Sequence, residues 1–334
     1  LPLSSIKRAA LPAGSVLCGI DSIFADGFEP ASFTSTAQMS GGVASPGLTQ
    51  DITAPLTSVA ITSPTGSTGD PTVDVIGTFA GPVNTGVTVN GVVGYTANGH
   101  FLVPNVPLSA GSNTLSVTAT TLTGATATAS GSITQSGSPS PLVMQVNYPV
   151  GYAPFFVSFT FAIGPLPSGK PVQAVAINFK GSGPNDFTGS SLAGAPAGYT
   201  YPQPGFYTAS FSVTDTGSNT YTTYRSVVIQ DIPTQRGMLC DVYGYLQDRL
   251  AHQDATNASN AFSLDHRLDY VNLFNVLGSN MPTVGQQLGV IATGQLGGTF
   301  ADLLLVRDNP DQTRSGFPLR MTMGADGVWR ISEM

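Results

Sequence analysis

Three acidic side chains near the N-terminus have the spacing that most directly suggests chemistry. Asp21, Asp26 and Glu29 lie within nine residues of one another, among apolar residues of the same segment. Carboxylate oxygens are the ligands that Ca²⁺ takes in proteins, so this segment is a candidate calcium site. The spacing does not follow an EF-hand loop, and Gly27 between the acids is more typical of a turn. We therefore expect a turn here, with calcium binding as the alternative.

The only two cysteines, Cys18 and Cys240, offer a second kind of chemistry. In an oxidising compartment they could form a disulfide that closes most of the chain into one loop. The chain-entropy account assigns such a loop about 4 to 5 kcal/mol of stabilisation. Two unpaired thiols, one of them buried, are the equally weighted alternative, because the sequence does not give the distance between the two Cα atoms.

No motif of the common enzyme classes accompanies these residues. The sequence contains no glycine-rich phosphate loop, no Cys/His spacing typical of a metal site and no GxSxG nucleophile motif. It contains only 3 histidines, and His100 falls in a predicted strand beside a turn. Because a catalytic triad needs a placed base, we predict a protein without enzymatic activity and without a cofactor.

Composition narrows the class of protein further. The 334 residues include 12 Lys and Arg against 19 Asp and Glu, a net charge of -7, and the basic residues are scattered, which argues against nucleic acid as a partner. Charged residues make up only 9%, whereas there are 39 Gly and 25 Pro, a balance that favours β-sandwiches joined by turns. No apolar run reaches the roughly 18 residues that span a bilayer. The chain begins at Leu1 without an apolar leader, so we expect an exported protein whose signal peptide has been removed.

The segment from Cys18 to Glu29, with its IFADGFE run, resembles a short signature near the ends of exported proteins of gammaproteobacteria, Xanthomonas relatives especially. The match covers about a dozen residues. It implies an extracellular or outer-surface protein of a Gram-negative bacterium. Residues 31–55 are then rich in Ser, Thr, Gly and Ala, so we expect residues 1–55 to form an arm and a linker.

Residues 56–135 have the pattern of a β-sandwich. Seven short apolar and β-branched runs are separated by turn residues, including Asn90-Gly91 and Asn98-Gly99, and Asn-Gly between alternating runs is a strong hairpin signal. Such a series predicts an immunoglobulin-like (Ig-like) sandwich. Residues 61–79 and 87–120 resemble Ig-like modules of the glucodextranase B-domain type, and the resemblance implies a spacer or a binding module without catalytic residues of its own.

Residues 136–141 read as a linker, and residues 142–232 as a second sandwich. From Phe206 the alternation of apolar and polar residues, the turn at Gly217 to Asn219 and the return to Ile229 predict a long hairpin. Tyr201, Gly205, Tyr207 and the run from Ser212 to Asn219 resemble the PKD family of extracellular Ig-like domains. Acidic relatives of that family hold Ca²⁺ with aspartates in the stretch that matches residues 177–186. Here Asn178, Lys180 and Ser182 stand in place of the acids, leaving Asp186, so we expect no metal there.

At residue 233 the pattern changes from strands to helices. Leu239, Val242, Tyr243, Leu246 and Leu250 form one face of an amphipathic helix. Further elements are expected in this order: a helix over 257–262, a helix capped near Asp265, a helix from Pro282 through Ile291, and strands over 300–306, 317–323 and 328–331. This order, with the closing DGVWRI strand, resembles the NTF2-like (SnoaL-like) cone fold, which implies an α+β domain over residues 233–334.

Some NTF2-like enzymes place a carboxylate and a His or Tyr inside the cone, and the resemblance makes Tyr243, Asp248, His252, Asp265 and His266 the candidates. Asp248 and His252 are four residues apart and share a helix face. That face points away from Leu246 and Leu250, so we expect a solvated pair rather than an active site. His266, with Asp269 near a helix start, is expected to be surface charge.

Together these patterns predict a mainly β protein: an arm, two tandem Ig-like sandwiches and a smaller α+β NTF2-like domain, arranged as a three-domain rod. We expect a non-catalytic structural or adhesive protein at the bacterial surface. One form of this role would be a subunit of a self-assembling surface fibre. Partners would be other copies or other surface proteins, with carbohydrate as a further candidate. Two alternatives stay open: a module of a larger RHS/YD-repeat exported protein, and a small-molecule-binding or catalytic NTF2-like domain carried on Ig-like spacers.

Overall fold

The first sandwich is built from nine short strands, seen in a computed structural model that describes residues 52–138 and 140–334. One sheet has the order β1-β3-β7-β6 and the other β2-β9-β8-β4-β5. The bounds are β1 Ser58–Ser63, β2 Ser67–Thr68, β3 Thr72–Ala80, β4 Gly86–Val89, β5 Val92–Val93, β6 Tyr95–Ala97, β7 His100–Pro107, β8 Gly111–Thr120 and β9 Thr126–Gln135.

The predicted Asn-Gly turns of this sandwich are confirmed. Asn90, Gly91, Asn98 and Gly99 all have positive φ, as the tight turns of right-twisted hairpins require. Between the two turns, β5 and β6 are separated at Gly94, where a Cβ atom would come within 2.6 Å of a Val103 methyl group. That close approach lets the chain pass from one sheet to the other between β5 and β6.

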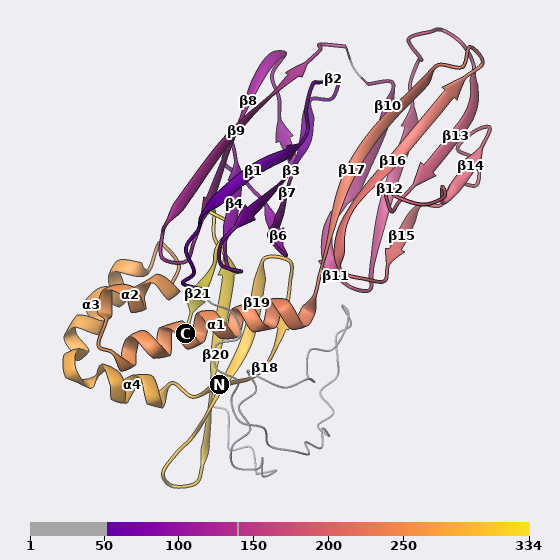
Figure 1. The fold of residues 1–334 in the computed structure, drawn as a ribbon. Coiled ribbons are helices and arrows are strands. Elements are labelled where there is room, and N and C mark those ends of the chain that lie inside the picture. The colour runs from indigo at the N-terminus through magenta and orange to yellow at the C-terminus, as the bar shows by residue number, and fades with distance from the viewer. Residues whose placement is uncertain (1–51, 139) are drawn as a thin grey trace.

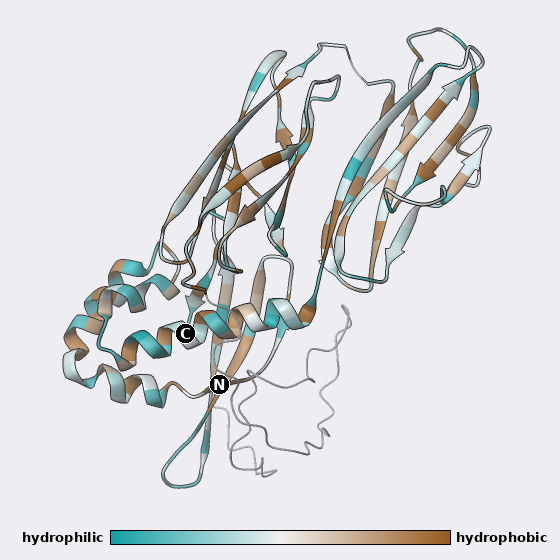
Figure 2. Ribbon diagram, in the orientation of Figure 1, coloured by the Kyte–Doolittle hydropathy of each residue, from teal (hydrophilic) through white to brown (hydrophobic). Residues whose placement is uncertain are grey.

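The second sandwich pairs a sheet of order β10-β12-β15 with one of order β11-β17-β16-β13-β14. Its bounds are β10 Leu142–Asn147, β11 Val150–Tyr152, β12 Phe155–Ile163, β13 Val172–Asn178, β14 Phe187–Gly189, β15 Gly198–Tyr201, β16 Gly205–Asp215 and β17 Thr220–Gln230. The predicted hairpin is confirmed: β16 and β17 pair from Thr214 opposite Thr220 to Gly205 opposite Ile229. Apolar and polar residues alternate along its strands (Figure 2), and the apolar set forms the core.

The C-terminal domain has four α-helices followed by an antiparallel sheet of order β18-β19-β20-β21. Its bounds are α1 Ile232–Ala251, α2 Ala255–Ala258, α3 Arg267–Leu277, α4 Met281–Gln287, β18 Val290–Leu296, β19 Phe300–Asp308, β20 Arg314–Met323 and β21 Trp329–Glu333, with 3-10 turns at Ser259–Ala261 and Gly278–Asn280. Helix and sheet side chains share one continuous core. The mainly β architecture, with two Ig-like sandwiches and a terminal α+β domain, is therefore as predicted.

Two predicted details of this domain are wrong. The fourth helix does not continue through Ile291: α4 ends at Gln287, Gly289 takes a φ of 85°, and Ile291 lies in β18 opposite Leu305. Pairing with β19 therefore prevails over helical propensity at that point. Asp265 does not cap α3 either, because His266 is the N-cap residue and makes no side-chain capping hydrogen bond.

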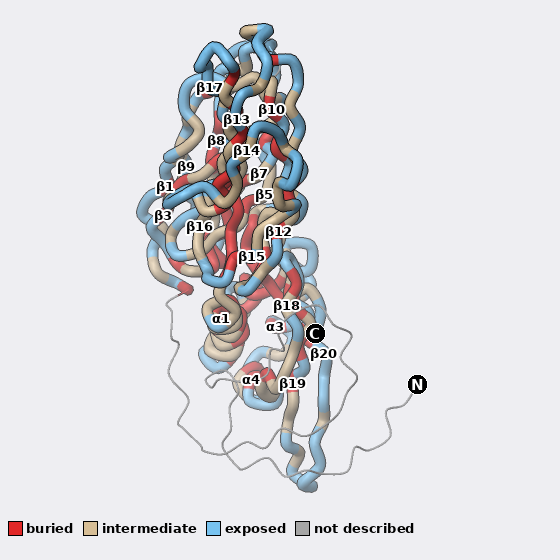
Figure 3. Tube along the Cα trace, turned by 90° about the vertical axis from the view of Figure 1, so that its right-hand side faces the viewer, coloured by how far each residue is buried: buried red, intermediate tan, exposed pale blue. Residues whose placement is uncertain are grey.

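The expected rod is also wrong. The two sandwiches stand side by side on the C-terminal domain, and the β19–β20 hairpin projects on the opposite side (Figures 1 and 3). β17 passes into α1 through the single residue Asp231, whose side chain caps the helix by accepting hydrogen bonds from the Thr234 amide at 2.9 Å and hydroxyl at 2.7 Å. The first sandwich folds back to contact both other domains.

Candidate functional site

Tyr243 is a structural residue of the C-terminal domain. It is 3% exposed on α1, and its hydroxyl donates a hydrogen bond to the Gly289 carbonyl at 2.9 Å. Gln247, one turn further along, donates to the same carbonyl at 3.1 Å. Burial raises the pKa of Tyr243, so the phenol stays neutral at ordinary pH. Both side chains therefore fix the connection between α4 and β18 to α1.

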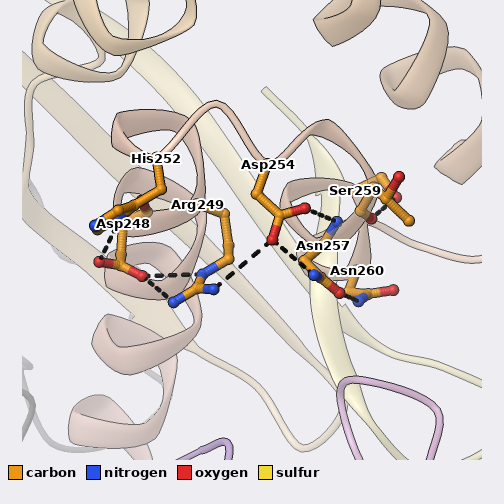
Figure 4. Close-up of polar contacts among 8 residues, drawn as sticks. Asp248, Arg249, His252, Asp254, Asn257, Ser259 and Asn260 are labelled. Atoms are coloured by element: carbon orange, nitrogen blue, oxygen red, sulfur yellow. Dashed lines mark hydrogen bonds and ion pairs between the residues drawn. The ribbon is translucent and has the colours of Figure 1, made fainter.

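Asp248 and His252 lie side by side near the end of α1 (Figure 4). The His252 side chain is 70% exposed, and its Nδ1 lies 3.3 Å from Asp248 Oδ1 and 2.8 Å from the Asp248 carbonyl. Arg249 donates to Asp248 through Nε at 2.9 Å and, in a shorter contact, through Nη2. The structure therefore brings the side chains of Asp248 and His252 together at the surface of α1, whereas the Tyr243 hydroxyl bonds to Gly289 instead.

The same arginine connects α1 to the next helix (Figure 4). Its Nη1 lies 3.7 Å from Asp254, the N-cap residue of α2. Asp254 accepts hydrogen bonds from the Asn257 side chain at 2.7 Å and from the Asn257 amide at 3.1 Å. The hydrogen bond from the Asn257 side chain is the main reason that the pKa of Asp254 is lowered. These polar groups hold the end of α1 against the start of α2.

The other C-terminal candidates lie at the surface. Asp265 is exposed, and the His266 and Asp269 side chains are 55% and 80% exposed with 3.9 Å between their nearest charged atoms. The space between the helices and the sheet is filled by apolar side chains, among them Leu239, Leu246 and Met321. No candidate carboxylate or imidazole points into that core.

In the second sandwich, a lysine occupies the place of the expected acids. Lys180 Nζ lies 2.8 Å from Asp186 Oδ1, and the other Asp186 oxygen accepts the Phe179 amide at 2.8 Å. Asn178 Oδ1 accepts the amides of Lys180 and Gly181 at 2.9 and 2.8 Å. The hydrogen bond that Lys180 donates to Asp186 is the main cause of the raised pKa of Lys180. The ammonium is therefore the charged partner of Asp186 in this loop.

The N-terminal candidates Asp21, Asp26, Glu29 and Cys18 lie outside the described residues. Cys240 is half-buried on α1 against the core of the C-terminal domain, and its pairing with Cys18 stays a prediction. Over residues 52–138 and 140–334, no three His, Cys, Asp or Glu side chains gather as metal ligands would. Within the same residues, no helix has the length and apolar character of a membrane span.

The groups that the sequence did not single out are those that join the domains. Asn84, in the loop between β3 and β4, is 2% exposed and lies against the edge strand β21. Its amide nitrogen donates to the Trp329 carbonyl and its oxygen accepts the Trp329 amide, both at 2.9 Å. One side chain thus replaces a strand partner at the edge of the C-terminal sheet.

Backbone and apolar contacts complete this junction. A Cβ atom on Gly86 would lie 2.2 Å from the Asp326 carbonyl oxygen, so only glycine allows the two backbones to meet. Leu122, from the turn between β8 and β9 of the first sandwich, is fully buried in the core of the C-terminal domain. The first sandwich therefore completes a core more than one hundred residues away in the chain.

The two sandwiches are joined by a second set of contacts. Asp74 accepts the Ser226 amide at 3.0 Å and the Asn105 amide at 3.2 Å. Asp70 lies 3.7 Å from Arg225, and both side chains are less than one fifth exposed. Burial raises the pKa of Asp70, although Arg225 acts in the opposite direction.

Sequence signals for these junction residues are faint. Leu122 is an apolar residue in a Thr-rich turn, and Asp74 is a single acid within an apolar strand. Either residue could have been predicted from the sequence to contact another domain. Asn84 and Gly86 lie among residues that are typical of any turn, so the sequence does not indicate their contacts with the C-terminal domain.

No protein-family model and no curated protein sequence matches the chain. Among solved structures it is similar to the fibronectin(III)-like modules of CbhA from Clostridium thermocellum, with 13% identity, 52% of this chain and 94% of that chain covered, and a TM-score of 0.20. It is also similar to dimeric latent PorU from Porphyromonas gingivalis, with 16% identity, 57% and 22% covered, and a TM-score of 0.27. A tetra-tandem repeat in the extending region of a large adhesion protein gives 16% identity, 84% and 66% covered, and a TM-score of 0.19. At these TM-scores neither the fold nor the proposal below rests on the likeness.

Proposed function

We propose that this protein is a non-catalytic extracellular protein with a structural or adhesive role, in which three domains form one rigid unit. The observation that carries the proposal is the buried junction: Asn84 paired with β21, Gly86 against Asp326, and Leu122 within the C-terminal core. Spacer modules that only separate an active domain from a surface need no such contacts. A unit that transmits force or presents a fixed surface does need them.

The polar candidates support the same role. Tyr243 holds the start of β18, Asp248 pairs with exposed His252 and Arg249, and Lys180 neutralises Asp186. Each of these groups already has a partner that stabilises the fold. The low charge content and the two cysteines fit an exported chain. We also propose that the second sandwich is PKD-like and that the C-terminal domain is NTF2-like.

The finer form of the proposal is a surface fibre subunit in which an N-terminal arm or a free strand edge pairs with the next copy. Sheet edges are available at β14 and at β18 in the described part of the chain. A deletion that tests the arm should end at residue 51. Ile52 must stay, because it is 3% exposed in the core of the C-terminal domain.

A catalytic cone has no observation in its favour, because Asp248 and His252 lie outside the core that an active site would occupy. A module of a larger RHS/YD-repeat protein is compatible with the same rigid unit, and differs from a free subunit only in what precedes or follows it.

Electron microscopy of cells that export the protein, with antibodies against residues 52–334, tests the proposal. We expect label on the outer surface, and on fibres if the subunit assembles. Loss of the fibres on deletion of residues 1–51 would assign the contact to the arm, whereas unchanged fibres would assign it to a strand edge. Label confined to the cytoplasm would contradict the proposal.

A further inference from the structure

Four large apolar side chains are exposed on α3 or just before it, and we call them the α3 face: Leu264, Leu268, Leu273 and Val276. Val276 is 85% exposed and Leu268 77%, the two highest values among the large apolar residues that the structure describes. Leu268 and Val276 lie about two turns apart on one side of the helix, and Leu273 adjoins Val276 three residues earlier. In Figure 1, α3 lies at the outer edge of the C-terminal domain. Apolar side chains gathered in this way mark an interaction surface, whereas a single exposed leucine does not.

The opposite side of α3 attaches the helix to its domain. Phe274 is 3% exposed and Tyr270 is half-buried, and their ring centroids lie 5.9 Å apart. Both rings also contact Phe262, at centroid distances of 6.0 Å from Phe274 and 3.5 Å from Tyr270. The α3 face is therefore not needed to hold the helix in place, and in a single copy it is open to a partner.

Charge decides which partner fits the α3 face. Asp265 and Asp269 are exposed beside it, and among the described residues their one ionic partner is His266, 3.9 Å from Asp269. Arg267 is half-buried and donates to the Asn260 carbonyl at 3.4 Å. The α3 face of a second copy would bring like charges together, and an anionic membrane surface would be repelled as well. The partner that fits is therefore basic as well as apolar.

The chain contains a segment of this chemistry outside the described residues. Lys7 and Arg8 are the only adjacent basic residues in the sequence, and they are the only Lys or Arg among residues 1–51. Large apolar residues flank them on both sides: Leu3, Ile6 and Leu11. Residues 3–11 therefore combine the charge and the apolar side chains that the α3 face requires.

The length of the chain allows this segment to meet another molecule. Residues 12–51 connect it to Ile52, which is 3% exposed in the core of the C-terminal domain. These forty residues span at most about 140 Å, enough to reach the same domain of a neighbouring copy. We propose that the α3 face binds residues 3–11 of a second copy, with Lys7 and Arg8 beside the exposed aspartates. The inference rests on the fibre form of the proposed function, because it names the surface that receives the arm.

Fluorescence anisotropy with the full chain and a labelled peptide of residues 1–14 tests the docking. We expect saturable binding that weakens about tenfold in Leu268→Ser or Val276→Ser, and also with a peptide that carries Lys7→Glu and Arg8→Glu. Both α3 positions are exposed, so these variants should keep the fold and the melting temperature. Tyr148→Ser, at a 72% exposed position of the second sandwich, is the matched control and should bind as the wild type does. No saturable binding, or equal binding by all variants, would overturn the proposal.

Charge reversal tests whether the segment comes from a second copy. One full-length variant carries Lys7→Glu and Arg8→Glu, and the other carries Asp265→Lys and Asp269→Lys. In either variant alone the segment and the α3 face have the same charge, so sedimentation should show monomers. An equimolar mixture should associate, because opposite charges then meet between copies.

A mixture that stays monomeric while the peptide binds would place the segment on the α3 of its own copy and overturn the proposal, as would association of either variant alone. These measurements need neither export nor fibres. Their failure is therefore distinguishable from failure of the surface role, which electron microscopy of cells decides.

Discussion

At the scale of single residues, Asp215 shows how one carboxylate can fix a turn. It is fully buried at the end of β16 and accepts the Ser168 hydroxyl at 2.5 Å, the Gly217 amide at 2.7 Å and the Asn219 amide at 2.9 Å. The hydrogen bond from Ser168, followed by those from Asn219 and Gly217, lowers the pKa of Asp215 from 3.8 to about 2. Every donor favours the ionised form.

This lowered pKa predicts a pH dependence of stability. Because the folded pKa lies below the unfolded one, the stabilisation by Asp215 is complete above about pH 4 and is lost as the pH falls through about 2. Calorimetry of the wild type and Asp215→Asn should show a difference in melting temperature that is constant near neutral pH and shrinks below about pH 4. Asp265→Asn, at an exposed position, is the control. A constant difference down to about pH 2 would contradict the assignment.

Asn84 gives a second residue-scale prediction. Asn84→Ala leaves the buried amide and carbonyl of Trp329 without partners, which should lower the free energy of unfolding by about 1 to 3 kcal/mol. Urea unfolding can be followed by the fluorescence of Trp329, the only tryptophan in the chain. Asn272→Ala, exposed on α3, should leave the transition where it is. Equal transitions for the two variants would show that the Asn84 contact does not stabilise β21.

At the scale of elements, the turn between β8 and β9 belongs to two domains. Its strands pair within the first sandwich, while Leu122 at its tip packs in the core of the C-terminal domain. The passage from β17 into α1 has a similar effect, because one capped residue leaves no flexible connection between the second sandwich and the helix. Two neighbouring domains thus position the C-terminal domain.

Leu122→Ala tests whether that turn is part of the C-terminal core. Removing a fully buried leucine should cost about 2 to 5 kcal/mol, and the loss should appear in the unfolding reported by Trp329. Leu268→Ala provides the comparison, because Leu268 is 77% exposed on α3 and should change the stability by less than about 0.5 kcal/mol. An effect on the first sandwich alone would contradict the shared core.

At the scale of the whole molecule, the backbone contact at Gly86 decides whether the domains move together. Gly86→Ala would place a Cβ atom 2.2 Å from the Asp326 carbonyl, so the first sandwich must move away from the C-terminal domain. Overpacking of this kind costs about 1 to 3 kcal/mol. We expect hydrogen exchange at Trp329 and the turn of Leu122 to rise together by roughly tenfold, with a larger radius of gyration by X-ray scattering.

Gly298→Ala is the control for this measurement. Gly298 is exposed, and its Cβ would meet no atom within 4 Å, so exchange and dimensions should be unchanged. If exchange in Gly86→Ala rose at only one of the two segments, the domains would not open as a unit and the rigid assembly would be wrong.

The sequence by itself determined the local structure of this protein. Asn-Gly pairs require turns with positive φ, alternation along residues 205–229 requires a half-buried hairpin, and the spacing of Leu239, Val242 and Leu246 requires a helix. Lys180, in the place of an expected acid, forms an ion pair with Asp186 six residues further along the chain. Each of these outcomes depends on residues close together in the chain, whose interactions the order of residues fixes directly.

The tertiary structure alone decided how the domains meet. A pattern of apolar residues shows that a strand or helix has a buried face but not which domain covers it, so a linear order was expected where the first sandwich in fact folds back. The same holds for the end of α4, where pairing with β19 overrode helical preference. The burial of Gln230 and Gln235 could be recognised only in the folded chain, because a buried polar group is defined by what surrounds it in space.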